Sequence, residues 1–305
     1  MALNTIEAAK NFQTVLDQQM VMEAATGFME VNAGDVVYDG GDTVKIPTLS
    51  MQGLAAYDRE EGYNKGTVSL SYKDYTMTQD RGRQFTLDAM TVNESNFVAN
   101  ATKVMAEFQR TRVIPEVDAY RISKITALAK QANKVTQYNP AEADVLKKLD
   151  ADLYNILDII GDADDLVILM SYKAQQMLNN NEKFTKQVDV SQFQHGAINT
   201  RVKMYNDIPI INVTSDRMKS AFVFQDGKTT GQEAGGFKAD TAAKGVNWII
   251  MSRRSPIAVS KTDTMRIFDP MTYQKANAWA MDYRKFHDVW VPNERLAAVW
   301  ANIGA

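Results

Sequence analysis

Two histidines and no cysteine set the first limit on the chemistry available to this chain of 305 residues. Zinc sites are usually built from Cys and His, and His195 and His287 are far apart in the sequence. Without cysteine there is no disulfide and no thiolate nucleophile. His287 precedes Asp288, but adjacent residues of a strand point to opposite faces, which argues against a His–Asp catalytic pair. We predict a structural or surface histidine at 287.

The acidic run of Asp162, Asp164 and Asp165 is the next candidate, because carboxylates can bind a hard cation. An EF-hand loop would also need glycine at its sixth position and glutamate at its twelfth, which here are Val167 and Lys173. The run therefore predicts a solvated turn before a strand and no metal site.

The tripeptide Gly-Lys-Thr at 227–229 has the composition of the end of a phosphate-binding loop. The glycine that such a loop needs five residues earlier is Phe222, and an apolar segment that ends in Asp226 and Gly227 is typical of a hairpin turn. Neither G-x-S-x-G nor G-x-G-x-x-G occurs in the chain. The sequence thus predicts no catalytic residue, no metal site and no bound cofactor.

Composition and charge argue against nucleic-acid binding and against a membrane span or signal peptide. The chain has 34 Lys plus Arg against 37 Asp plus Glu, a formal net charge of -3, whereas a phosphate-neutralising protein needs a basic surplus. The basic clusters at 253–254 and at Arg81 and Arg83 are small, and we expect surface ion pairs there. No stretch approaches the roughly 18 apolar residues of a membrane span, and Glu7 and Asp17 argue against a signal peptide. Together with the lack of cysteine, this indicates a chain kept in a reducing cytoplasm.

Residues 50–82 form the most unusual stretch. Positions 57–66 are densely charged, and the alternation of Val68, Leu70 and Tyr72 that follows predicts a strand with one wet face. A two-stranded hairpin alone is marginal in water, so we expect this one to be stabilised by a partner. We predict that its charged residues make ion pairs between subunits; these are Arg59, Glu60, Glu61 and Lys65, together with Arg81 at the end of the stretch.

Helical spacing predicts an amphipathic helix within 5–30 and a much longer helix that begins at the capping box Thr91–Glu94. Pro115 stands halfway along the long helix, where its missing N–H and its ring force a kink or a restart. If the two halves are collinear, the rod is about 50 Å long, more than a compact domain of this size encloses.

The second half of the chain indicates a small α/β domain followed by strands. After a boundary at Asn139-Pro140 come an amphipathic helix that stops at Gly161, a buried strand at 166–170 and a helix capped by Ser171. Further strands are predicted at 208–213, 221–224, 246–251, 257–260, 265–268, 278–291 and 296–303. These elements together predict an α+β fold.

A series of short segments occurs in one order along nearly the whole chain: Ile46-Pro47, 53–59, Asp80-Arg81, 85–88, 94–97, 114–121, Lys261, 266–268 and 283–290. In that order they resemble the major capsid proteins of tailed bacteriophages, whose Hong Kong ninety-seven fold is also used by encapsulin shells. The resemblance implies an N-terminal arm, an extended loop lying over a neighbouring subunit, a peripheral domain with a spine helix, an axial domain, and returning strands that complete the sheets. Their bounds would be 1–49, 50–82, 83–135, 136–250 and 251–305.

The resemblance further implies that the chain is not an enzyme. It would assemble with itself, through hexamers and pentamers, into an icosahedral shell that encloses double-stranded DNA without sequence-specific binding. It would be located in the virion capsid after assembly in the host cytoplasm, with portal and decoration proteins as further partners. Because the sequence starts almost directly at its arm, a separate scaffolding protein or none is expected. The kink at Pro115 would adapt the spine helix to shell curvature.

Other interpretations stay open. An encapsulin-type compartment would enclose a protein cargo instead of DNA. An α/β enzyme acting through carboxylates such as Asp162, Asp164 or Glu116 would need a deep pocket that gathers two or more of them. A nucleic-acid-binding protein would need a one-sided basic face and affinity that falls steeply with salt.

Overall fold

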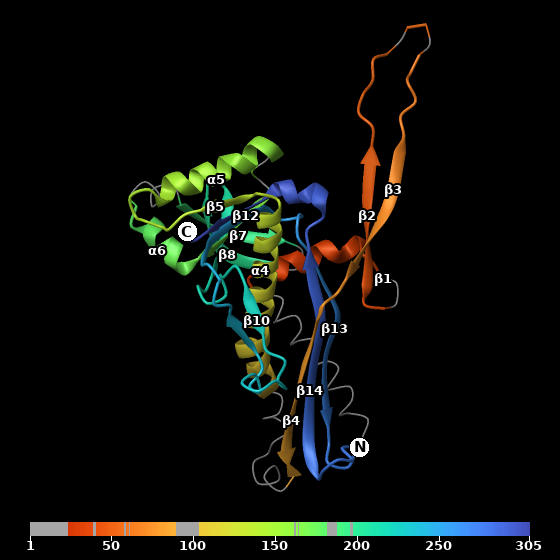
Figure 1. Ribbon diagram of the computed structural model, residues 1–305, viewed down its shortest axis with the longest axis vertical. Coiled ribbons are helices and arrows are strands. Elements are labelled where there is room, and N and C mark those ends of the chain that lie inside the picture. Colours follow the sequence, from red (N-terminus) through yellow and green to blue (C-terminus); the bar gives the residue numbers. More distant parts are fainter. Residues whose placement is uncertain are drawn as a thin grey trace.

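The computed structural model gives an α+β protein with a two-stranded ribbon that projects far from its body (Figure 1). It describes residues 24–38, 41–57, 59–60, 62–89, 104–161, 163, 165–181, 188–195 and 198–305, with the side chains at 35, 38 and 188–202 left out. Most of the predicted N-terminal helix lies outside these residues, and only its end, from residue 24, is described. The capping box at 91–94 and the carboxylates Asp162 and Asp164 also lie outside them.

A mixed seven-stranded sheet forms the centre of the body, in the order β5-β15-β12-β6-β9-β8-β7. Its strands are β5 (Val135–Gln137), β6 (Leu166–Ser171), β7 (Val188–His195), β8 (Ile198–Tyr205), β9 (Ile208–Val213), β12 (Val246–Ser252) and β15 (Val299–Ile303). Helices α5 (Val145–Ile160) and α6 (Tyr172–Asn179) cover one face, and α4 (Ile114–Gln131) packs on the other. The predicted strand at 166–170 is confirmed as a central strand with every residue buried.

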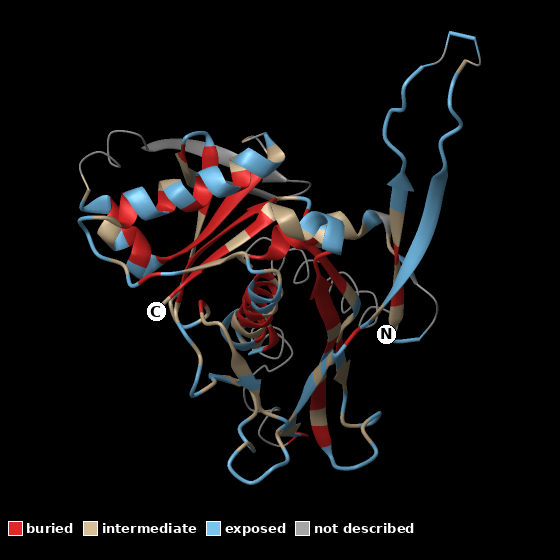
Figure 2. Ribbon diagram, turned by 45° about the horizontal axis from the view of Figure 1, so that its top comes forward, coloured by how far each residue is buried: buried red, intermediate tan, exposed pale blue. Residues whose placement is uncertain are grey.

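Alternating side chains of β6 enter two separate cores, because successive residues of a strand point to opposite faces. Ile168 and Met170 pack with the helices α5 and α6, whereas Val167 and Leu169 pack with α4. This two-sided burial explains why β6 and β12 carry continuous apolar runs (Figure 2).

The predicted helix ends are confirmed. Gly161 adopts φ 72°, a left-handed conformation that lets it stop α5 without a Cβ clash. The side chain of Ser171 accepts a hydrogen bond from the backbone N–H of Ala174 at 3.3 Å and so caps α6.

A long three-stranded antiparallel sheet runs away from the central sheet, in the order β13-β14-β4. Its strands are β4 (Gln79–Asp88), β13 (Ile257–Phe268) and β14 (Ala278–Trp290). The prediction of two strands at 257–260 and 265–268 is wrong, because the chain stays paired with β14 through a bulge between Ser260 and Thr262. The predicted strand at 296–303 begins only at Val299, after the 3-10 helix η3 (Asn293–Ala298).

Two smaller elements complete the body. The 3-10 helix η1 (Gly27–Asp35) lies where the predicted N-terminal helix was expected to end. Strands β10 (Phe222–Phe224) and β11 (Phe237–Ala239) pair antiparallel, and Gly227 adopts φ 72° in the loop between them. The predicted hairpin turn at Asp226 and Gly227 is therefore part of a longer loop between two paired strands.

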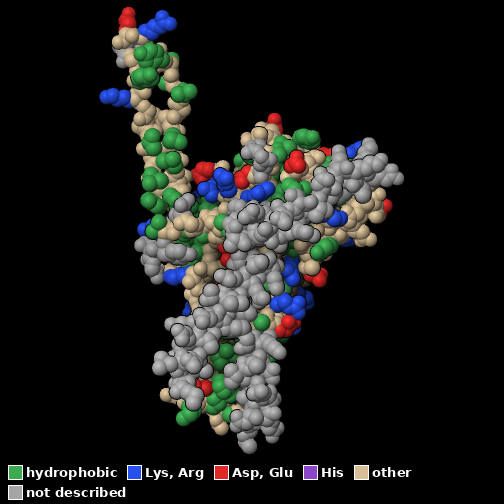
Figure 3. Space-filling view, turned by 180° about the vertical axis from the view of Figure 1, so that it is seen from behind, with side chains coloured by type: hydrophobic (Ala, Val, Ile, Leu, Met, Phe, Trp, Pro, Cys, Tyr) green, Lys and Arg blue, Asp and Glu red, His purple; other side chains and the backbone are tan. Residues whose placement is uncertain are grey.

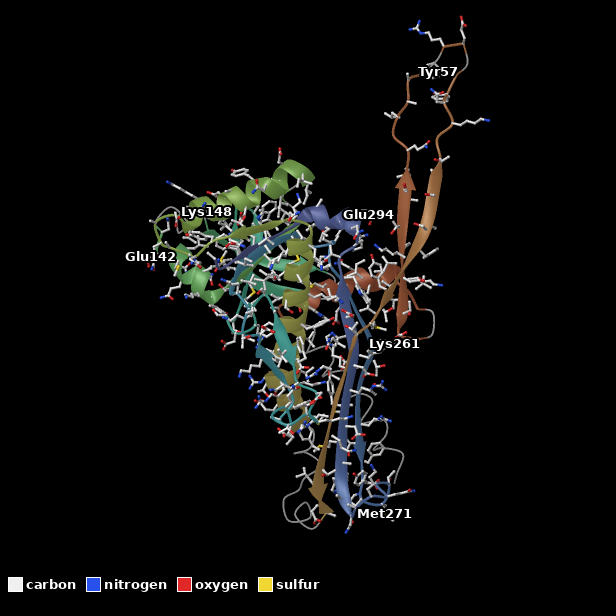
Figure 4. The ribbon with its side chains drawn as sticks, viewed as in Figure 1. Tyr57, Glu142, Lys148, Lys261, Met271 and Glu294 are labelled. Atoms are coloured by element: carbon white, nitrogen blue, oxygen red, sulfur yellow. The ribbon has the colours of Figure 1, made fainter. Side chains whose placement is uncertain are left out.

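The projecting ribbon consists of β2 (Thr43–Met51) and β3 (Val68–Thr76), with the short β1 (Val37–Tyr38) added at its base. It extends in the opposite direction from the long sheet, so that Tyr57 near its tip and Met271 in the β13–β14 turn mark the two ends of the molecule (Figure 4). Almost all of its outer part is exposed (Figure 2).

The long helix is continuous over residues 104–131 but not uniform. Residues 104–108 are α-helical, Gln109–Val113 (η2) form a π turn, and α4 follows with Pro115 in its first turn. The N–H of Ile114 bonds to the carbonyl of Gln109, the wider spacing that defines a π turn. None of the helices in the described residues is long and apolar enough to cross a membrane.

Candidate inter-subunit surface

The outer half of the ribbon has one apolar face. Strand register places Leu49 opposite Leu70 and Met51 opposite Val68, and directly opposed residues of an antiparallel pair lie on the same face. Tyr72 continues this row two residues further along β3. All five side chains are more than half exposed, between 52% and 68% (Figure 3). Such a contiguous exposed apolar face is typical of a surface that meets another molecule.

The other face of the same segment is polar. Thr48 lies opposite Ser71 and Ser50 lies opposite Ser69, so hydroxyl groups alternate with the apolar residues along both strands. The ribbon is therefore two-faced, and from Leu49 outward both faces are exposed.

The apolar side of the ribbon changes between its base and its outer half. At the base, Val44 and Ile46 are buried in a cluster with Trp290 and Val259 of the long sheet. These residues occupy even positions of β2, the same side as Thr48 and Ser50, whereas the exposed apolar residues of β2, Leu49 and Met51, occupy odd positions. Hence the apolar face of the base packs on its own chain, whereas the apolar residues of the outer half lie on the opposite face of the ribbon.

The tip of the ribbon is held together by its own contacts. The rings of Tyr57 and Tyr63 pack edge to face with centroids 5.0 Å apart, and the side-chain amide of Asn64 donates to the carbonyl of Ala56 at 2.8 Å. Tyr63 is nevertheless 89% exposed. The tip is shaped in advance of any partner, yet it leaves aromatic surface uncovered.

The charged residues predicted to pair between subunits divide into two groups. Arg59, Glu60 and Lys65 are exposed in the segment between β2 and β3, and Glu61 lies outside the described residues. Figure 3 shows basic and acidic side chains at the tip of the ribbon. Pairing of these residues with a neighbouring subunit stays a prediction.

Arg81 has partners within its own chain. It forms an ion pair with Glu116 of α4 and donates to the carbonyl of Gly236 at 3.1 Å, with its guanidinium 5.8 Å from the ring of Phe224. Burial raises the pKa of Glu116 even though Arg81 opposes that shift. Arg81 therefore fixes β4 to α4 and to the β10–β11 loop, and a contact of Arg81 with another subunit stays a prediction.

Strand β3 of the ribbon continues into β4 of the long sheet through Met77 and Thr78, which we call the hinge. Both the N–H and the hydroxyl of Thr78 donate to one carboxylate oxygen of Asp288, each at 3.0 Å. The other oxygen accepts from the hydroxyl of Tyr120 at 2.7 Å and forms an ion pair with Lys124. Sequence reasoning missed this group, because nothing in the spacing of these residues indicates that they meet.

Further buried ion pairs surround α4. Arg121 pairs with Glu30 of η1, and burial would raise the pKa of Glu30, but the positive charges of Arg121 and Lys285 hold it below its ordinary value. Asp118, fully buried, accepts from Arg217 at 3.1 Å. The helix is thus joined to its surroundings by polar contacts as well as by apolar packing.

His287 is buried within this polar layer, as predicted for a structural histidine. Its ring lies edge to face with Tyr120, centroids 5.6 Å apart, and it is 3% exposed. Burial lowers the pKa of His287 well below 6.5, and the nearby charges of Arg121, Lys285, Arg81 and Lys124 add to that shift.

We expect this histidine to make the subunit less stable in acid. The folded chain keeps it neutral, whereas the unfolded chain binds a proton below about pH 6.5, so the free energy of unfolding should fall by about 1.4 kcal/mol per pH unit below that value. The free energy of unfolding of His287→Gln, measured in urea between pH 7 and pH 5, should fall with pH less steeply than that of the parent, by this amount per pH unit. His195→Gln is the control. Equal slopes in the parent and in His287→Gln would contradict the prediction.

Of the carboxylates weighed for an enzyme, the structure describes only Glu116, which pairs with Arg81. Asp165 of the acidic run accepts from the hydroxyl of Ser252 at the end of β12. Among the described residues no three His, Cys, Asp or Glu side chains are grouped as metal ligands. A cavity of about 450 Å³ between α4 and the end of β15 includes Lys130 and Lys244 but no carboxylate side chain in its lining.

The π turn places an irregularity of the long helix directly before Pro115. A proline lacks the N–H for a regular helical bond, and its ring would clash with the carbonyl four residues earlier. A π turn is one way for a helix to accommodate such a site without ending. Whether this irregularity serves shell curvature stays a prediction.

No protein-family model matches the chain, and no curated protein matches its sequence. Solved structures do match it. A chain in the asymmetric unit of the bacteriophage PhiM1 mature capsid is 14% identical, with a TM-score of 0.56 over 88% of this chain and 84% of that one. A chain from Mycobacterium phage Bobi is 10% identical, with a TM-score of 0.57 over 91% of this chain and 90% of that one. A chain in the capsid structure of cyanophage P-SCSP1u is 9% identical, with a TM-score of 0.56 over 88% of this chain and 85% of that one.

At these identities the likeness establishes the fold. It extends over about nine-tenths of the chain. The α+β prediction and the Hong Kong ninety-seven fold implied by the family resemblance are both confirmed.

Proposed function

We propose that this chain is the major capsid protein of a tailed bacteriophage, and that it assembles through hexamers and pentamers into an icosahedral shell enclosing double-stranded DNA. The observation that carries the proposal is the exposed apolar face of the ribbon, present on a fold shared with phage capsid chains. A two-stranded ribbon is marginal alone, and an apolar face on it is a liability for a protein that stays monomeric.

We also propose a division of labour, with residues 1–49 as the arm, 50–82 as the loop lying over a neighbouring subunit, 83–135 as the peripheral part with the spine helix, 136–250 as the axial domain and 251–305 completing the sheets. The ribbon itself begins earlier than this loop, because β2 starts at Thr43. Specific interfaces bury about 1,600 Å² each, and a shell subunit makes several of them. The marginal ribbon is then stabilised by the assembly.

The enclosed DNA needs no specific site. The formal net charge of -3 suits a container, because a strongly cationic wall would bind phosphates and hinder the movement of DNA. We propose scaffolding, portal and decoration proteins as partners, assembly in the host cytoplasm and a final place in the virion.

Electron microscopy of the purified protein tests the proposal. Uniform closed particles, tubes or isolated rings are expected on concentration, alone or with a scaffolding protein. A chain that stays monomeric at high concentration under all these conditions would refute the shell. Particles that carry a folded protein cargo and exclude DNA would instead identify an encapsulin-type compartment.

The charged tip gives a further prediction. Reversing two cations together, Arg59→Glu and Lys65→Glu, should lower the yield of particles at 0.15 M salt, because each rim ion pair lost costs up to about 1 kcal/mol. Folding should be unchanged, since both side chains are exposed. The loss should shrink when parent and variant are compared at high salt. The matched control is Lys228→Glu with Lys238→Glu on the body, and unchanged yield in the tip variant would contradict the prediction.

A further inference from the structure

The hinge, Met77 and Thr78, is the direct link between strand β3 of the ribbon and strand β4 of the long sheet. Met77 is 4% exposed, and its N–H donates to the carbonyl of Asp42 at 2.8 Å. On the outer side of the base, Lys261 of β13 donates to the carbonyl of Gly41 (Figure 4). A ribbon as long as this one turns any small rotation at its hinge into a large displacement of its tip.

Apolar packing attaches the base but does not by itself specify an angle. The cluster at the base contains Val44, Ile46, Met77, Ile257, Val259 and Trp290. Hydrophobic burial is non-directional and depends on the area removed from water, whereas hydrogen bonds weaken steeply away from their preferred angle. The orientation of the ribbon therefore depends on the directional contacts of the hinge.

The two hydrogen bonds that Thr78 donates go to one buried carboxylate. Asp288 is 0% exposed and binds both donors of Thr78 through one oxygen and two donors of α4, Tyr120 and Lys124, through the other. The hydroxyls of Thr78 and Tyr120 also lie 3.1 Å apart. A buried carboxylate is costly unless its hydrogen bonds are satisfied, so the groups that satisfy it are held together.

We propose that Asp288 is a positioning residue that locks the hinge and thereby couples the direction of the ribbon to the position of α4. A shift of α4 along β14 would remove Tyr120 and Lys124 from the carboxylate and leave it under-satisfied. The hinge and the helix are therefore expected to move together, and what disturbs one releases the other. This device belongs to the single chain and goes beyond the proposed function.

Spin labels can test the lock, because the chain has no cysteine of its own. Labels at Ser69→Cys on the ribbon and Glu294→Cys on the body report the angle between them as a distance distribution. We expect one narrow peak for the parent and for Thr78→Ser, which keeps the hydroxyl, and a clearly broader distribution for Thr78→Val. Amide exchange at Thr78 should speed up roughly tenfold in Thr78→Val, the factor for one hydrogen bond to a charged group.

Two further variants separate the lock from general loosening. Thr126→Val removes a buried hydroxyl of α4 that bonds only to the carbonyl of Ile122, and the peak should stay narrow. Val259→Ala weakens the apolar cluster and should lower stability with the peak still narrow. A narrow peak in Thr78→Val, or a peak in Val259→Ala as broad as that in Thr78→Val, would overturn the proposal.

The measurement is made on dilute, unassembled chain. Its outcome is therefore independent of whether the protein forms shells, and failure of one proposal leaves the other standing. Should Asp288→Asn fold, it is expected to broaden the peak at least as much as Thr78→Val, and a narrow peak in that variant would also count against the lock.

Discussion

Replacing Leu70 with aspartate is expected to prevent particle assembly while leaving the subunit folded. Leu70 is 58% exposed in the single chain and lies at the centre of the apolar face of the ribbon. Within an interface, the new aspartate would be a buried and unpaired carboxylate. This costs about 3 kcal/mol or more, which lowers each association constant roughly a hundredfold. In the unassembled subunit the same carboxylate stays in water, so folding should change by only about 0.5–1 kcal/mol.

The control is an aspartate at the adjacent position. Ser69 lies next to Leu70 in β3 but on the polar face, opposite Ser50. Ser69→Asp adds the same charge to the same strand, but on the polar face, where no apolar side chain is lost. Particle yield by electron microscopy and subunit stability by urea unfolding are measured for both.

The comparison has a clear point of failure. If Ser69→Asp blocks assembly as strongly as Leu70→Asp, then charge on the ribbon matters and its apolar face does not. If neither variant changes the yield, the ribbon is no part of the contact between subunits. The assignment of the apolar face is supported only if Leu70→Asp loses particle assembly and Ser69→Asp retains it.

The sequence predicted best where burial is continuous or a local signal ends an element. Strand 208–213 has the bounds of β9, and the strand at 166–170 is one residue short of β6. The stop at Gly161 and the cap at Ser171 depend on neighbouring residues alone, so no tertiary information was needed for them. Strands β7 and β8 were missed, although the alternation that begins at Val188 offered a signal.

The ribbon shows what periodicity can and cannot give. The alternation of Val68, Leu70 and Tyr72 predicted β3, but the partner row at Leu49 and Met51 follows from strand register. Register depends on how two segments pair, and a shift of one residue would move every side chain to the other face. The two-faced character of the ribbon is therefore a property of the pairing, beyond the reach of either strand alone.

Long-range polar contacts were also beyond the sequence. A contact of Arg81 with another subunit stays a prediction, but its partners within its own chain, Glu116 and Gly236, were not foreseen. Thr78 and Asp288 are separated by 210 positions. A charged residue has the same appearance in a sequence whether it is buried with a partner or exposed, and only the fold decides between the two.

Asp118 gives the largest effect expected on the stability of the subunit. It lies in α4 with 0% exposure and accepts from the N–H and the hydroxyl of Thr26, at 3.1 and 2.6 Å, and from Arg217 at 3.1 Å. Asp118→Ala leaves the buried N–H of Thr26 unsatisfied and removes the counter-charge of Arg217. Breaking a buried pair in this way costs about 3–5 kcal/mol, and the lower end applies because Arg217 is partly exposed and can regain water.

Urea unfolding of the unassembled subunit measures this cost, with Asp158→Ala as the matched control. Asp158 lies on the exposed side of α5, so its removal deletes one negative charge at an expected change within about 0.5 kcal/mol. Asp118→Asn keeps the size of the side chain and one acceptor, and should fall between the two. Because Asp118 joins α4 to the segment that leads into η1, its loss should also free that segment, seen as faster amide exchange at Thr26. A cost for Asp118→Ala no larger than that of Asp158→Ala would mean that water replaces the carboxylate without loss, and that apolar packing alone holds the segment against the helix.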